Sequence, residues 1–239
     1  MNTLLAPGTS AAGTRRPSRA GAGTLPRRRA AWFFTIALGA GLAGCSFLKP
    51  ARPTARHFVL TPMPVTGPAS APANALAVGL GQVKMPAYLF DTSLAVRKGT
   101  NEVDYLSQML WAERLDTGFQ RVLAADLAIA LPTDRILLSA WQSDAVAAEV
   151  YVTVVQFDVD VSGRGVLVAR WRILSPGGER TLKTGECRRQ RQGALPEADA
   201  SGAVSTLSEL VADCSRQLAQ TLQELAPTFR ERPSPNSPP

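Results

Sequence analysis

The chain has 239 residues, of which 45% are hydrophobic and 19% are charged, and its formal net charge is +7. The excess lies at one end, because residues 1–44 contain six arginines and no acidic residue. Without them 20 Lys and Arg face 19 Asp and Glu, a net charge of +1, so the composition excludes the strongly basic character of a nucleic-acid-binding protein.

Residues 1–44 have the features of an export signal. Their arginines precede AAWFFTIALGAGLAG, an apolar run of about fifteen residues, which suits a signal peptide and is short of the roughly 20 residues that span a bilayer. The first arginine pair lies about thirty residues before Cys45, which indicates a later translation start or an unusual leader. A twin-arginine signal is a further alternative.

The apolar run ends in Leu42-Ala43-Gly44-Cys45, which resembles the bacterial lipobox at every position. The resemblance implies that Cys45 carries a diacylglycerol, that the chain is cut after Gly44, and that the new amino terminus is acylated, for example with palmitate. A buried cysteine in an N-terminal helix is the alternative, but it does not explain the acid-free leader. The mature chain, residues 45–239, has the size of one domain.

The mature chain begins with a short β-prone run, HFVLT at 57–61, which we expect to join a sheet and to hold the domain close to the membrane. The uncharged residues 62–75, rich in Pro and Ala, predict a linker, so 45–75 forms the lipidated N-terminal region. A folded domain is expected over 76–226, and the proline-rich residues 227–239 are expected to be disordered.

The first half of the domain alternates between strand and helix patterns. Residues 75–84 predict a strand, and 93–98 with 102–106 predict a hairpin around Gly99-Thr100-Asn101. A helix is expected over 115–131, capped by Asp116 or Thr117 and closed by Pro132.

Residues 151–174 predict an antiparallel hairpin. A three-residue loop at 163–165 places Phe157 opposite Trp171 and Asp158 opposite Arg170 on a polar face, with Gly165 in the left-handed position. A third strand is expected over 180–187. Residues 198–225 predict a long helix whose apolar stripe suits core packing, or alternatively a coiled-coil partner. The predicted fold is a single α+β domain with a mostly antiparallel sheet and two main helices.

Cys187 lies near the end of the third strand and Cys214 on the apolar helix face. A disulfide between them is geometrically possible, and two buried thiols are the alternative.

No catalytic, metal or cofactor site is expected. His57 is the only histidine, it has no HExxH or CxxC context, and no Gly-x-Ser-x-Gly elbow occurs. Asp158 and Asp160 alternate with apolar residues on a strand, where paired surface charges are a simpler account than a carboxylate dyad.

Two stretches carry a family resemblance: VGLGQVKMPAYL at 78–89 and WAERLDTGFQRVLAADLA at 111–128. With the lipobox, the opening strand and the final helix, they resemble the PqiC/YmbA-type ABC-transport auxiliary lipoproteins. The sequence departs from the family where Arg114 stands in place of a common proline.

The resemblance implies a non-enzymatic periplasmic lipoprotein, held by its lipid on the inner leaflet of the outer membrane, as Ser46 after the lipidated cysteine also suggests. Its implied partners are an MCE-domain protein and an inner-membrane ABC complex that together move lipids, and a homo-oligomer is a further expectation. Tyr88, Leu89 and Trp111 are candidates for the partner face, although they could instead pack on the domain's own core. The alternatives are a stand-alone lipid-binding or envelope-assembly lipoprotein, and a hydrolase that would need His57.

Overall fold

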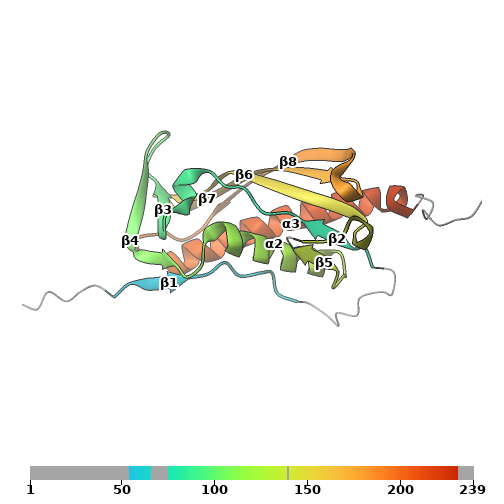
Figure 1. Ribbon diagram of the computed structural model, residues 1–239. Helices are drawn as coiled ribbons and strands as arrows, with labels where there is room; N and C mark the ends of the chain where they lie inside the picture. Colours follow the sequence, from blue (N-terminus) through green and yellow to red (C-terminus); the bar gives the residue numbers. More distant parts are fainter. Residues whose placement is uncertain (1–53, 66–74, 139, 231–239) are drawn as a thin grey trace, which may run out of the picture. The chain divides into compact units, whose positions relative to one another are not determined.

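A computed structural model of the protein describes residues 54–65, 75–138 and 140–230 (Figure 1). The predicted signal peptide, Cys45 and most of the predicted linker therefore lie outside the described residues. The strands are β1 (Arg56–Phe58), β2 (Val78–Leu80), β3 (Ser93–Arg97), β4 (Val103–Trp111), β5 (Ile136–Leu138), β6 (Ala148–Asp160), β7 (Arg164–Leu174) and β8 (Thr181–Gln192). The helices are α2 (Leu115–Ala130) and α3 (Ala200–Arg230), with short 3₁₀ turns η2 (Ala87–Phe90), η3 (Ser143–Ala145) and η4 (Pro176–Gly178).

Within the described residues the strands form one sheet with β6 at its centre. One edge of β6 pairs with β7, and its other edge pairs with β2 near its start and with β3 near its end. The β3–β4, β6–β7 and β7–β8 ladders are antiparallel. The shorter β1–β4, β2–β5, β2–β6 and β3–β6 ladders are parallel. The predicted α+β class is confirmed, with a mixed rather than purely antiparallel sheet.

Both helices cover one face of this sheet (Figure 1). The long helix α3 contacts β6, β7, β8 and α2, and its apolar stripe is buried by the rest of the chain. Phe119 of α2 meets Phe157 of β6 edge-to-face, with ring centroids 5.3 Å apart. Such a pair contributes about 0.5–1.5 kcal/mol beyond the area that it buries. The stripe of α3 therefore serves the domain's own core, as the first of the two interpretations predicted.

The helix bounds differ from the prediction mainly at the C-terminal end. α2 spans Leu115–Ala130, so it begins before Asp116, and its N-cap residue Arg114 makes no side-chain capping bond. The Asp116 side chain instead accepts from the Thr117 N–H in the first turn at 2.9 Å. α3 runs from Ala200 to Arg230, so residues 227–230 of the predicted tail are helical. Residues 231–239 lie outside the described part of the chain.

The predicted register of the β6–β7 hairpin is wrong. Phe157 pairs with Leu167 and Asp158 with Val166, because the turn lies at 161–163. Farther from the turn, the ladder shifts again at a bulge between Val154 and Gln156. Gly163, not Gly165, takes the left-handed conformation, with φ of 82°. The bulge changes which face the alternate residues occupy, so Val150, Val152 and Val154 are buried before it and Phe157 and Val159 after it.

Candidate functional site

The segment at residues 56–63, which follows the predicted lipid anchor, is attached to the domain; we call it the anchor segment. β1 pairs in parallel with the end of β4, where Phe58 lies beside Trp111. Beyond β1, the Leu60 carbonyl accepts a hydrogen bond from Arg121 Nη2 at 3.0 Å, and the Met63 N–H donates to Asp126 Oδ1 at 2.8 Å. The predicted strand at 57–61 is thus confirmed, in a shorter form, and α2 holds the residues that follow it.

Asp126 is a buried acid at the centre of this attachment. Its side chain is 0% exposed, and it accepts hydrogen bonds from the Met63 N–H and from Ser215 Oγ at 3.3 Å. Burial raises the pKa of Asp126, while the two donors oppose that shift. A single acid on an otherwise apolar helix face gave no signal in the sequence, because its partners are remote in the chain.

The Met85–Phe90 segment closes a gap along the edge of β6, between the positions where β2 and β3 pair with it. Tyr88 Oη donates to Asp158 Oδ2 at 2.9 Å and accepts from the Phe157 N–H at 3.5 Å. Tyr105 Oη donates to the Tyr88 carbonyl at 3.0 Å. Burial, and then the charge of Asp158, raise the pKa of Tyr88 to about 12. Tyr88 is therefore a structural link within the domain.

Asp158 is buried rather than placed on a polar face opposite Arg170 as predicted. Its side chain is 1% exposed, and Arg97 Nη2 of β3 donates to Oδ2 at 2.6 Å. Gln156 Nε2 donates to the other oxygen at 2.9 Å. Asp160 is the last residue of β6, and Arg164 Nε at the start of β7 pairs with it at 3.1 Å. Each of the two carboxylates is thus engaged by its own arginine.

The residues predicted to face a partner differ in accessibility. Leu89 is 3% exposed and belongs to the core, whereas Trp111 is half-buried and packs at the edge of that core. Phe90, the neighbour of Leu89, is 48% exposed, and the Arg114 guanidinium lies 5.3 Å from the centre of its ring. The exposed aromatic surface near the start of α2 therefore consists of Phe90 and part of Trp111.

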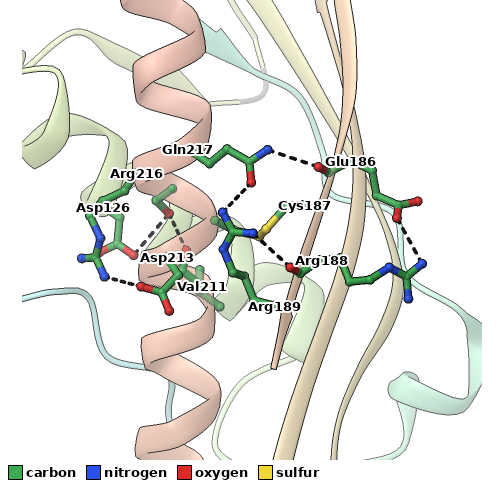
Figure 2. The surroundings of a disulfide bond; sticks show 11 residues. Asp126, Glu186, Cys187, Arg188, Arg189, Val211, Asp213, Arg216 and Gln217 are labelled. Carbon is green, nitrogen blue, oxygen red and sulfur yellow. Dashed lines mark hydrogen bonds and ion pairs between the residues drawn. A yellow bond between two sulfur atoms is a disulfide. The ribbon is translucent and has the colours of Figure 1, made fainter. Parts of the chain in front are cut away.

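Cys187 of β8 and Cys214 of α3 form a disulfide, with their Cα atoms 5.8 Å apart (Figure 2). Both side chains are buried. Figure 2 shows Arg189 and Gln217 beside the bridge, where Arg189 Nη2 donates to Gln217 Oε1 at 2.8 Å and Gln217 Nε2 donates to the Glu186 carbonyl at 3.2 Å. The bridge links the outermost strand of the sheet to the helix beneath it.

His57 is exposed on β1. In the described ranges, no group of three or more His, Cys, Asp or Glu side chains is placed to hold a metal ion. None of the helices in these ranges combines the length and the apolar character needed to cross a bilayer.

The mixed sheet carries two helices on one face, and β1 is attached at its edge, so the described residues form a single α+β domain. The family described as "ABC-type transport auxiliary lipoprotein component" matches residues 58–219. The chain belongs to this family. No curated protein matches the sequence significantly.

Two solved structures share the fold. Protein XCC0632 from Xanthomonas campestris, of the family DUF330, is 10% identical with a TM-score of 0.61, over 74% of this chain and 100% of that one. The crystal structure of another, uncharacterized protein is 20% identical with a TM-score of 0.57, over 71% of this chain and 99% of that one. At these identities the likeness shows the fold alone.

The two stretches that carry the family resemblance meet in space. Gln120 Nε2 on α2 donates to the carbonyls of Leu80, the last residue of β2, at 3.2 Å and of Gly81 at 3.0 Å. A Cβ on Gly81 would lie 2.6 Å from the Tyr151 ring, so the close approach requires glycine. These motif residues build the fold and the attachment of the anchor segment rather than a reactive centre.

Proposed function

We propose that the protein is a periplasmic lipoprotein, anchored through acylated Cys45 on the inner leaflet of the outer membrane. There it acts as a non-enzymatic auxiliary subunit of an MCE/ABC-type system that moves lipids between the two membranes. Membership of the transport auxiliary lipoprotein family carries the proposal. The anchor segment supports it, because an attachment that begins at Arg56 leaves about ten residues between the lipid and the domain.

In this role the protein fixes where a transport conduit meets the membrane. Its partners are an MCE-domain protein and the inner-membrane ABC complex, and several copies can assemble around one conduit. Phe90 and Trp111 are the proposed contact residues, because Phe90 is 48% exposed and the half-buried Trp111 lies beside Phe58 of the anchor segment. Aromatic side chains are enriched at the buried centres of protein interfaces.

The alternative is a stand-alone lipid-binding lipoprotein with a cavity between helices and sheet. The edge-to-face contact of Phe119 with Phe157 occupies that space, which favours the auxiliary role. Native mass spectrometry of the purified protein distinguishes the two, since a retained phospholipid supports the alternative.

The proposal is tested by expressing the wild-type chain and Cys45→Ala with a C-terminal tag in a bacterium that carries an MCE system. The wild type should partition with the membrane fraction, gain the mass of its acyl groups and recover an MCE protein after crosslinking. The variant should stay unprocessed. Lipidation without recovery of any MCE or ABC component would reject the transport role while leaving the anchor intact.

A further inference from the structure

The β7–β8 hairpin concentrates the positive charge of the mature chain. Residues 164–192 hold eight Lys and Arg against two Glu, whereas the mature chain as a whole has a net charge of +1. The rest of the mature chain therefore carries a net charge of about −5. Such segregation points to an anionic partner at this hairpin.

The cations of the hairpin divide between the two faces of the sheet. On the helix side Lys183 pairs with Glu224 at 3.0 Å and Arg191 with Asp213 at 2.9 Å, while Arg189 bonds to Gln217. Arg170 and Arg172 flank the buried Trp171, so they lie on the opposite face. We call this the outer face, because neither α2 nor α3 lies on it (Figure 1).

Four cations gather on the outer face, and we call them the basic sheet face: Lys84, Arg170, Arg172 and Arg188. The ladder register places Lys84 beside Thr153 and Thr153 beside Arg170. Two of these cations pair with Glu186: Arg170 Nε lies 3.3 Å from Oε2, and Arg188 Nη2 lies 3.1 Å from Oε1. In the described part of the chain Lys84 and Arg172 make no ion pair, and the basic sheet face together with Glu186 carries a net charge of +3.

An apolar residue lies among these cations. The bulge in β6 turns Val155 outward, where it is 44% exposed. The guanidinium carbon of Arg172 lies 5.8 Å from the centre of the Tyr151 ring. Tyr151 also lines a shallow hollow together with Thr153 and Thr184. Guanidinium and hydroxyl donors around an apolar residue suit the phosphates and the interfacial region of a lipid bilayer.

We propose that the basic sheet face docks on the surface of an anionic phospholipid membrane, so that the domain lies flat against its bilayer beside the lipid anchor. This rests on the lipid anchoring proposed above. Each cation near an anionic surface strengthens attraction about five-fold, so removing three should lower the docking constant roughly 100-fold. Salt should weaken docking as well, because exposed charges are screened.

The test uses the mature lipidated protein with Val155→Cys, whose new thiol is the only free one when Cys45 is acylated and Cys187 is bridged to Cys214. A fluorophore on that thiol should be quenched by lipid-borne quenchers in vesicles that contain phosphatidylglycerol, and not in vesicles of phosphatidylethanolamine and phosphatidylcholine alone. Ser205→Cys, exposed on α3 behind the opposite face, is the control site and should show no quenching in either.

Lys84→Gln/Arg170→Gln/Arg172→Gln should abolish the quenching, and it leaves Glu186 paired with Arg188 so that the fold is preserved. Arg56→Gln/Lys98→Gln/Arg135→Gln, which removes the same charge elsewhere, should retain it. Equal quenching in both kinds of vesicle, or quenching that survives the first triple variant, overturns the proposal. The proposal is also overturned if the first triple variant loses a crosslinked protein partner while its quenching is unchanged. That result would show that the basic sheet face contacts a protein. Absence of acyl groups from the purified mature protein, read from its mass before it is mixed with vesicles, rejects the anchor instead.

Discussion

Replacing Cys187 and Cys214 together by alanine should cost about 3.5 kcal/mol of unfolding free energy, from the loop-closure entropy of a 27-residue separation. For a domain of this size that lowers the melting temperature by about 10 °C. Other contacts will not compensate, because the flanking links between β8 and α3 are exposed ion pairs such as Lys183–Glu224, worth about 0–1 kcal/mol each.

The assay is urea unfolding of the wild type, the double variant and each single variant, with and without a reducing agent. Each single variant should be at least as unstable as the double variant, and reductant should lower the stability of the wild type alone. Alkylation in denaturant without reductant should leave the wild-type mass unchanged. Addition of two alkyl groups under those conditions, or equal stability of wild type and double variant, would refute the assignment of a structural disulfide.

Four further substitutions test the packing and the electrostatics. Burial raises the pKa of Asp126, so this carboxyl keeps its proton to a higher pH in the folded state than in the unfolded state. The wild type should therefore lose stability as the pH rises above about 4, where the unfolded chain begins to release that proton. Asp126→Asn should flatten that part of the pH profile, measured by thermal melts, and an unchanged slope contradicts this. Tyr88→Phe should lower the unfolding free energy by about 1 kcal/mol, because the hydrogen bond to Asp158 is lost. Asp158→Ala should lower it by about 3 kcal/mol, because it leaves Arg97 without its partner. Equal losses for the two variants in urea unfolding would count against the buried pair. Gly185→Ala places a methyl group against the Trp171 ring and should cost about 1–3 kcal/mol with a change in near-UV circular dichroism, while a silent substitution would show that the ring can move.

The elements with strong periodicity could be predicted from the sequence. The helix expected over 115–131 forms as Leu115–Ala130, and the hairpin around residues 99–101 forms with its flanking strands. The strand expected over 75–84 forms as Val78–Leu80, and the long final helix expected over 198–225 forms as Ala200–Arg230. In each case the apolar pattern of one short stretch decides the structure, so no information from remote residues is needed.

The features that depend on remote residues could not be predicted. The turn at 161–163 pairs Asp158 with Val166 rather than Arg170, and its carboxylate is covered by Tyr88 and Arg97, which are 70 and 61 residues away in the sequence. No local pattern in β6 marks these remote partners, or the bulge between Val154 and Gln156. The parallel pairing of β2 and β3 with β6 joins segments that are far apart in sequence. At the candidate site, Phe90 is exposed and Leu89 is buried, although the two residues are neighbours in the same 3₁₀ turn, so the sequence alone did not show which of them is accessible.

The most direct test of the proposed role is photo-crosslinking in intact cells from a photoreactive amino acid at position 90, with the same substitution at position 205 on α3 as the control. We predict a crosslink from position 90 to an MCE-domain protein, identified by mass spectrometry, that is absent from position 205 and is lost when Cys45→Ala keeps the chain from being lipidated. A lipidated, folded protein whose position 90 crosslinks to no MCE or ABC component would contradict the account.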